Sequence, residues 1–234
     1  MNHDGNHEFD RNLCVLSGQC VDACPYGALE FSAGHMTVSE LMDTIEKDRP
    51  YYERSGGGLT VSGGEPFFQP EFTRALLEEA SERGIHTAVD TSLYTSWANI
   101  ESVLPITDLW LVDLKLMDSE RHKELTGVSN DPILKNLRAL SAVEGASVIV
   151  RLPVVAGANA DGQNFQEAAD FVASLTDSPE VEVLPYHAMG LNKAAAIGNG
   201  GLVKEFEKPD AETLDTVKRV IQERGIALKN GQEE

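Results

Sequence analysis

Three cysteines lie close together near the start of the sequence, with the spacing of iron–sulfur ligands. Cys14, Cys20 and Cys24 are the only cysteines among the 234 residues, and a proline follows Cys24. The run fits the bacterial ferredoxin pattern C-x₂-C-x₂-C-x₃-C-P with Ser17 at the second position. An odd, clustered set of cysteines favours metal ligation over disulfides. The three residues are therefore candidate metal ligands, and a decayed site with three ordinary thiols is the alternative.

A second set of reactive side chains follows the ends of five successive predicted strands. The C-terminal ends of parallel strands gather at one rim, where barrel enzymes place their chemistry. Because side chains alternate along a strand, Asp113 and Lys115 lie on one side of an otherwise apolar run and need a partner or a ligand. The groups at the five ends are Gly63-Gly64-Glu65, Asp90-Thr91-Ser92, Asp113-x-Lys115, Arg151 and His187.

Each of these residues also has an ordinary structural explanation. The two glycines suit a tight turn, and Asp113 and Lys115 could simply pair with each other. His187 could be a half-buried histidine with satisfied hydrogen bonds, and Arg151 could lie on the surface. Their repetition at one end of one sheet favours a small-molecule site.

The segments that carry these groups alternate between short β-branched runs and amphipathic stretches. Such alternation predicts an α/β fold with a parallel sheet wound in βα units. Helices are expected from the capping box Thr37-x-x-Glu40, from Pro70, around 97–104, from the cap Asp131-Pro132, and near 163–175 and 211–224. Strands are expected at 58–62, 85–90, 109–112, 147–153, 181–185 and 226–228. The glycine-rich connection 188–209 is long enough to be functional.

Composition excludes several classes of protein. The net charge of −19 opposes binding to phosphate backbones, so no nucleic-acid partner is expected. No run of 18 apolar residues exists, so no membrane span is expected. The polar N-terminus has no signal-peptide core, which predicts a cytoplasmic protein. The length allows one sizeable domain with a small appendage.

From Cys14 onward the sequence resembles the activating enzymes of glycyl radical enzymes, of the pyruvate formate-lyase activating type within the radical SAM superfamily. Several segments are diagnostic only in combination. Beside the ferredoxin-like cysteine run, they are residues 36–38, 55–66, 90–92, 107–115, 127–130, 151–154 and 184–187.

The resemblance implies a role for most of the rim residues in binding S-adenosylmethionine (SAM). In that family the Gly-Gly-Glu-Pro segment, here 63–66, holds the SAM amino group. Asp90, Thr91 and Asp113 match positions that bind a monovalent cation, with Leu111 as a backbone contributor. Lys115, Arg151 and His187 match residues near the carboxylate, ribose or sulfonium. The full implied cofactor-binding set is Gly63, Gly64, Glu65, Asp90, Thr91, Asp113, Leu114, Lys115, Arg151 and His187, and no catalytic residue is assigned.

The resemblance also implies an activity and partners. A reduced 4Fe–4S cluster cleaves SAM to a 5′-deoxyadenosyl radical, which abstracts a hydrogen from a glycine of a large glycyl radical enzyme. Flavodoxin or ferredoxin is the implied electron donor. The alternatives are a non-catalytic remnant that binds SAM or docks the partner, and a barrel lyase or aldolase with Lys115 as a Schiff-base lysine.

The sequence departs from the family in its cysteines. In the family, the cysteines of a C-x₃-C-x₂-C motif bind the SAM-cleaving cluster. Cys20 and Cys24 have the spacing of the first two cysteines of that motif, but the third position is occupied by Gly27. We therefore expect an N-terminally truncated form. Residues 1–36 are predicted to be a partial ferredoxin-like 4Fe–4S module, and 37–234 a partial (β/α) barrel without its first strand. The exposed strand edge predicts low stability or aggregation.

Overall fold

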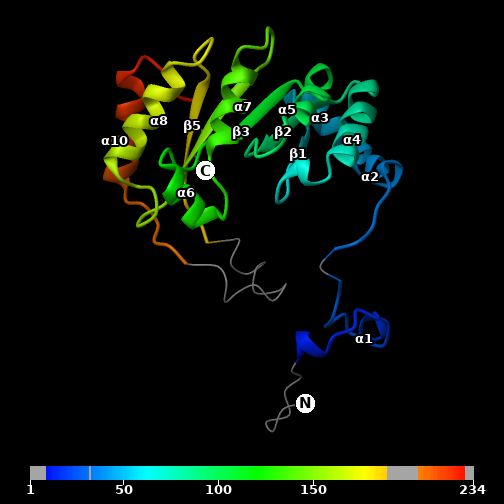
Figure 1. Ribbon diagram of the computed structural model, residues 1–234. Helices are drawn as coiled ribbons and strands as arrows, with labels where there is room; N and C mark the ends of the chain where they lie inside the picture. Colours follow the sequence, from blue (N-terminus) through cyan, green and yellow to red (C-terminus); the bar gives the residue numbers. More distant parts are fainter. Residues whose placement is uncertain (1–8, 32, 189–204, 230–234) are drawn as a thin grey trace. The chain divides into compact units, whose positions relative to one another are not determined.

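The structure is a computed structural model that describes residues 9–31, 33–188 and 205–229 (Figure 1). The chain divides into two compact units. One consists of residues 1–36 and 187–205, and the other of 37–186 and 206–234. The assignment of residues 1–36 as an iron–sulfur module and of 37–234 as a partial barrel remains a prediction. Most of the predicted functional connection 188–209 lies outside the described residues.

The first unit has little regular structure between residues 9 and 31. It contains the 3₁₀ helix η1 (Arg11–Leu13) and the one-turn helix α1 (Gln19–Asp22). None of the described residues 9–31 is buried, and Leu13, Val15 and Tyr26 are among its exposed apolar side chains. This segment therefore has no hydrophobic core of its own among the described residues.

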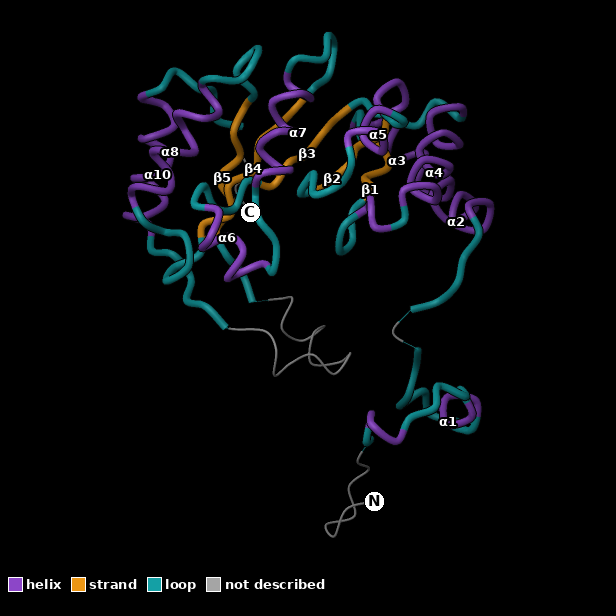
Figure 2. The backbone as a smooth tube through the Cα atoms, viewed as in Figure 1, coloured by secondary structure: helices purple, strands orange, loops and turns teal. Residues whose placement is uncertain are grey.

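The second unit is built on a parallel five-stranded sheet whose spatial order follows the sequence (Figures 1 and 2). The strands are β1 (Gly58–Val61), β2 (His86–Thr91), β3 (Leu109–Asp113), β4 (Val148–Val154) and β5 (Glu180–Pro185). The predicted strand at 226–228 is reduced to a single parallel bridge between Leu228 and Val181. This α/β architecture confirms the predicted fold class.

Helices connect successive strands and cover one face of the sheet (Figure 2). Thr37 and Glu40 form the predicted capping box at the start of α2. The predicted helix 97–104 ends early, and the 3₁₀ helix η4 (Leu104–Ile106) contains Pro105, which cannot donate a backbone hydrogen bond. The helices are α2 (Val38–Ile45), α3 (Arg49–Ser55), α4 (Pro70–Glu82), α5 (Trp97–Glu101), α6 (Ser119–Thr126), α7 (Asp131–Ser141), α8 (Gly162–Ala173) and α10 (Ala211–Glu223).

The predicted cap at Asp131 is wrong in detail. Asn130 is the N-cap residue of α7 and makes no side-chain capping bond, while Asp131 is the first helical residue. The Asp131 carboxylate instead accepts a hydrogen bond from the Ser129 hydroxyl at 2.7 Å. Pro132 still lies in the first turn, where the missing N–H has no intrahelical partner to lose.

The two faces of the sheet differ in composition, because side chains alternate along each strand. The helix-covered face forms the core with residues such as Val89, Trp110 and Val150, each 0% exposed. Asp113 and Arg151 belong to the opposite face and are only partly buried. We call this second face the charged face. Among the described residues, no helix is long and apolar enough to cross a membrane.

The first strand of the sheet lies at an edge. In the described sheet β1 pairs only with β2, and a groove of about 680 Å³ runs beside it, lined by residues of α2, β1 and α4. The low stability expected from this edge remains a prediction.

Candidate functional site

Strand register brings charged side chains of four strands into one row on the charged face. Asp113 of β3 pairs with Arg151 of β4, and Arg151 pairs in turn with Glu182 of β5. Asp90 of β2 pairs with Leu111, two residues before Asp113. Because these register partners share a face, the carboxylates of three strands surround the Arg151 guanidinium.

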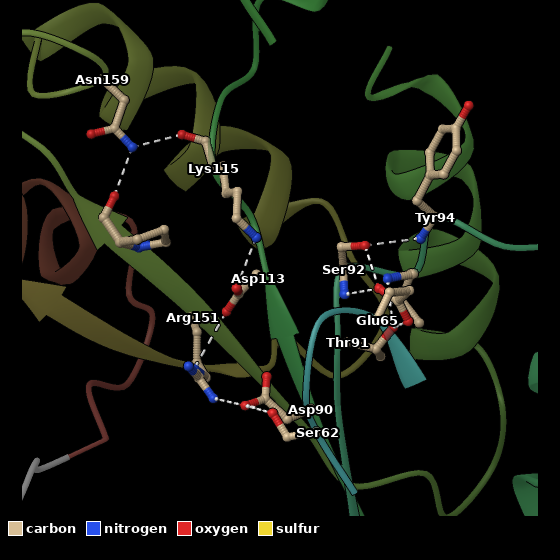
Figure 3. Close-up of polar contacts among 12 residues, drawn as sticks. Ser62, Glu65, Asp90, Thr91, Ser92, Tyr94, Asp113, Lys115, Arg151 and Asn159 are labelled. Carbon is tan, nitrogen blue, oxygen red and sulfur yellow. Dashed lines mark hydrogen bonds and ion pairs between the residues drawn. The ribbon is translucent and has the colours of Figure 1, made fainter. Parts of the chain in front are cut away.

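Ion pairs link this row (Figure 3). Arg151 Nη1 lies 2.8 Å from Asp90 Oδ2, and Arg151 Nε lies 3.4 Å from Asp113 Oδ1. Lys115 Nζ donates to Asp113 Oδ2 at 2.8 Å. Glu182 Oε2 lies 3.9 Å from Arg151 Nε. The structure thus brings together four of the predicted site residues, Asp90, Asp113, Lys115 and Arg151, and adds Glu182.

Two buried polar atoms in this row have no hydrogen-bond partner among the described residues, Asp113 Oδ1 and Arg151 Nε. Their contact at 3.4 Å does not have hydrogen-bond geometry. A buried acceptor and a buried donor left unsatisfied cost free energy unless a ligand or water completes them. This arrangement fits a small polar ligand that carries both an acidic and a basic group.

The Gly63-Gly64-Glu65 segment is tied to the end of β2 through the Glu65 carboxylate. Oε1 accepts from the Thr91 hydroxyl at 2.6 Å, and Oε2 accepts from the Ser92 amide at 2.9 Å and the Ser92 hydroxyl at 2.6 Å. The Phe67 amide donates a fourth bond at 3.3 Å. Gly63 has φ +124°, a conformation that side chains rarely adopt. The hydrogen bonds of Glu65 therefore fix the position of the loop, and the space beside Gly63 and Gly64 is accessible to a ligand.

A cavity of about 430 Å³ adjoins these strand ends. Glu65, Ser92, Lys115 and His122 are among the residues that line it. His122 is 3% exposed, and its Nδ1 lies 2.7 Å from the Val128 carbonyl oxygen. The segments that follow β1, β2 and β3 thus all contribute to the lining of this cavity.

Buried asparagines, which the sequence analysis missed, hold the loops around the charged row. Asn159 Nδ2 donates to the carbonyl oxygens of Lys115 at 2.8 Å and Pro153 at 2.6 Å. Its Oδ1 accepts from the Val155 amide at 2.8 Å. One amide thus joins the exits of β3 and β4. The available signal was an amide side chain among small apolar residues, because such a group needs backbone partners when it is buried.

A second asparagine plays the same part after β2. Asn136 belongs to α7 and is 5% exposed. Its Nδ2 donates to the carbonyl oxygens of Leu93 at 3.0 Å and Thr95 at 2.9 Å. Its position within an apolar helical pattern was a usable signal, because a polar residue on a buried helix face needs a partner.

Three other predicted site residues lie differently. The Leu114 side chain is 3% exposed and packs in the core, so only its backbone is near the row, where its amide donates to the Arg151 carbonyl at 2.9 Å. Thr91 is also buried, and its hydroxyl is occupied by Glu65 and the Leu93 amide. His187 is exposed, two residues beyond β5, and belongs to the first unit.

The three cysteines are not arranged as a metal site. Among the described residues, no group of three histidine, cysteine, aspartate or glutamate side chains could hold a metal ion. Cys14 Sγ accepts from the Leu16 amide at 3.4 Å, and Cys24 Sγ accepts from the Ala28 amide at 3.2 Å. Hydrogen bonds from the backbone of Tyr26 and Ala28 lower the pKa of the Cys24 thiol. The geometry does not fit a cluster, and we derive no step through one bound to these residues.

Comparison with known proteins gives a consistent set of similarities. Residues 16–172 match the sequence profile of the Radical SAM superfamily. The chain is 43% identical over 220 residues to the isethionate sulfite-lyase activating enzyme of Nitratidesulfovibrio vulgaris, covering 93% of this chain and 71% of that protein. It is 42% identical to the (2S)-3-sulfopropanediol dehydratase activating enzyme of Klebsiella oxytoca, covering 81% of this chain but only 60% of that protein.

Solved structures show the same similarity. A domain of a pyruvate-formate lyase-activating enzyme from Bacteroides vulgatus is 33% identical with a TM-score of 0.63, and the match covers 75% of this chain and 99% of that domain. A radical SAM methyltransferase from Sphaerobacter thermophilus has a TM-score of 0.65 at 18% identity, covering 83% of this chain and 57% of that protein. At that identity the likeness concerns the fold alone.

Proposed function

This chain belongs to the radical SAM superfamily and, within it, to the activating enzymes of glycyl radical enzymes, and we propose that its charged face binds SAM for that activation. Radical SAM proteins use SAM together with a 4Fe–4S cluster. The observation that carries the proposal is the linked row of opposite charges at the ends of β2, β3 and β4.

The row offers a partner for each charged group of the amino-acid part of SAM. The carboxylates of Asp90 and Asp113 can accept from the ammonium group, and Lys115 and Arg151 can donate to the carboxylate. Gly63 and Gly64 leave the adjacent loop open, with no atom within 4 Å of where a side chain would begin. The ion pairs of the row hold these groups in place before the ligand arrives, which reduces the entropy lost on binding.

Several finer assignments belong to this proposal. A monovalent cation at Asp90, Thr91 and Asp113 in place of the ammonium group, contacts of His187 with SAM, flavodoxin or ferredoxin as electron donor, and a cytoplasmic location are all inferred from the family resemblance. The protein substrate is a glycyl radical enzyme. Bound SAM, on one-electron reduction, supplies the radical that removes a hydrogen atom from a glycine of that partner.

The structure weakens the Schiff-base alternative. Lys115 Nζ is held in an ion pair with Asp113 at 2.8 Å, whereas a Schiff-base lysine must direct its nitrogen at a substrate carbonyl. The role that these contacts support is electrostatic binding by Lys115, and the remnant that binds SAM without cleaving it stays the second candidate.

Equilibrium dialysis of radiolabelled SAM against the 234-residue chain tests the proposal. We expect saturable binding, weakened at least about tenfold by Asp113→Asn because a carboxylate facing an ammonium group is lost. Asp170→Asn is the matched control, since Asp170 pairs with Arg224 and is 66% exposed. Absence of binding by the wild type, or equal binding by Asp113→Asn, would contradict the proposal. An anaerobic assay for 5′-deoxyadenosine then separates an active enzyme from a SAM-binding remnant.

A further inference from the structure

His122 is a buried histidine that the proposed contacts with SAM leave unused. It belongs to α6 and is 3% exposed. Its Nδ1 lies 2.7 Å from the Val128 carbonyl oxygen, which can only accept a hydrogen bond. The Thr126 hydroxyl lies 3.0 Å from Nδ1 but donates to the His122 carbonyl oxygen at 2.7 Å. Nδ1 therefore carries a proton, and in the neutral ring Nε2 is a hydrogen-bond acceptor.

The second ring nitrogen of His122 faces a cavity. Nε2 is neither hydrogen-bonded to a described residue nor sealed off from solvent. His122 lines the cavity of about 430 Å³ beside the loops that follow β1, β2 and β3, and the rest of its side chain is enclosed. One nitrogen thus fixes the ring to the protein, and the other remains available to a ligand.

The acceptors around this cavity differ in what they already bind. Glu65 also lines it, but both of its carboxylate oxygens accept hydrogen bonds from the end of β2. The Asp113 carboxylate binds Lys115 at 2.8 Å. Nε2 of His122 has no such partner among the described residues. The volume of the cavity lies in the range of ligand-binding sites, and Nε2 suits a ligand group that donates a hydrogen bond.

Two exposed aromatic side chains line the same cavity. Phe68 is 87% exposed and Tyr94 is 43% exposed. Figure 3 shows the Tyr94 side chain directed away from the Glu65 carboxylate. Large exposed apolar side chains beside a cavity are typical of surfaces that bind another polypeptide, where aromatic residues are enriched. The surroundings of Nε2 therefore favour a polypeptide as the donor.

We propose that this cavity receives the segment of the partner enzyme that carries the target glycine, and that His122 Nε2 accepts a hydrogen bond from a backbone N–H of that segment. The inference rests on the proposed SAM function. Hydrogen abstraction acts on a glycine backbone, so the segment must lie against the SAM-binding row, and Asp113 and Lys115 belong both to that row and to the cavity lining. Because glycine has no side chain, its recognition depends on backbone groups.

NMR of the ¹⁵N-labelled histidine rings tests this contact directly. The SAM-saturated protein is titrated with a probe peptide, a heptapeptide of alanines with glycine at its centre, acetylated and amidated at its ends. We expect the Nε2 signal of His122 to shift with added peptide, because this nitrogen gains a donor. The Nδ1 signal should stay in place, because its bond to Val128 is unchanged. The spectrum of His122→Asn, which lacks one ring, assigns the two signals.

The same variant separates peptide binding from structural support. His122→Asn keeps a side-chain amide that can donate to the Val128 carbonyl oxygen, but it has no atom at the place of Nε2. We expect the peptide to bind about fivefold more weakly, which corresponds to one neutral hydrogen bond. The affinity for SAM and the midpoint of thermal unfolding should not change. His86→Asn is the matched control, since His86 is exposed on β2 and does not line the cavity.

The two measurements also distinguish this inference from the function on which it rests. A wild-type chain that does not bind SAM overturns the proposed function and, with it, the inference. If SAM binds but the Nε2 signal does not move with the peptide, or if His122→Asn binds the peptide as the wild type does, the inference alone is wrong. Equal losses of SAM and peptide affinity in His122→Asn would also overturn it, because His122 would then only support the loop. The same loss of peptide affinity in His86→Asn would show that the effect does not come from the cavity.

Discussion

The same strands form both faces of the sheet, but one face carries the hydrophobic core and the other carries the charged row. In β3, Trp110 and Val112 are 0% exposed within the helix-covered core, whereas Asp113, the next residue, has a side chain that is 23% exposed in the charged row. In β4, Leu152 is 1% exposed beside Arg151 at 20%. Neighbouring residues of one strand thus stabilise the core on one face and carry the proposed binding groups on the other.

This separation has an energetic reason. Burial of apolar area stabilises the fold in proportion to the area removed from water, and the helix-covered face supplies most of it. Ion pairs that retain some solvent contribute little net stability. Substitutions on the charged face are therefore expected to lower the free energy of unfolding less than substitutions in the helix-covered core.

The largest expected effect is on the helix-covered face. Leu152→Ala should lower the free energy of unfolding by about 3 kcal/mol, because a fully buried leucine leaves a cavity behind. Leu111→Ala, on the charged face and only partly buried, should cost less than half as much. Urea denaturation monitored by circular dichroism measures both. Equal losses for the two leucines would show that the charged face is also a packed core.

The second effect concerns Asn159, which joins the exits of β3 and β4. Asn159→Ala removes three hydrogen bonds to the backbone at the exits of β3 and β4 and leaves buried backbone groups unpaired. We expect a loss of about 2 kcal/mol in the free energy of unfolding. Asn99→Ala is the control, since the Asn99 amide donates to the Thr95 hydroxyl at a half-buried site. If both variants lose the same stability, Asn159 does not tie the strand ends.

The sequence was sufficient for features that depend on neighbouring residues. The capping box at Thr37 and Glu40 and the alternation that puts Leu111 and Asp113 on one face follow from local rules, and the structure confirms them. The parallel sheet also followed from the βα pattern. The pairing of Asp113 with Lys115 had been one of two open readings.

Features that depend on distant segments were not predictable in this way. The ion pair between Asp90 and Arg151 is set by the register of β2, β3 and β4, to which no local pattern refers. Glu182 was missed for the same reason, since only its register with Arg151 gives it meaning. The strand expected at 226–228 is reduced to one bridge with β5. How far a segment pairs with a distant strand depends on the folded structure, which a local pattern does not describe.

A smaller effect is expected inside the charged row. Asp90→Asn removes the ion pair with Arg151 while its amide oxygen can still accept from the Ser62 hydroxyl, now at 3.2 Å. Because both partners keep 20% of their side-chain surface exposed to water, we expect the free energy of unfolding to fall by only about 1 kcal/mol. A double-mutant cycle with Arg151→Gln isolates the pair. A coupling energy as large as the loss in Leu152→Ala would show that the charged face carries stability after all.

The smallest effect lies in the loop between β4 and α8. Asp161 caps α8 by accepting from the Asn164 amide at 2.8 Å and also pairs with Arg121 at 2.8 Å. Partial burial alone would raise the pKa of Asp161, but the hydrogen bonds from Arg121 and the Asn164 amide outweigh it, so the pKa is lowered.

The lowered pKa fixes the direction of the pH dependence. A carboxyl group whose folded-state pKa lies below its unfolded value of about 3.9 stabilises the fold above that value and loses this contribution as pH falls through the folded-state pKa. The side chain is 42% exposed, so the contribution should stay under about 1 kcal/mol. Wild type should therefore be slightly more stable than Asp161→Asn at pH 7, with the difference vanishing toward pH 2 in urea titrations. A difference that persists at pH 2 would mean that the capping geometry, rather than the carboxylate charge, stabilises this loop.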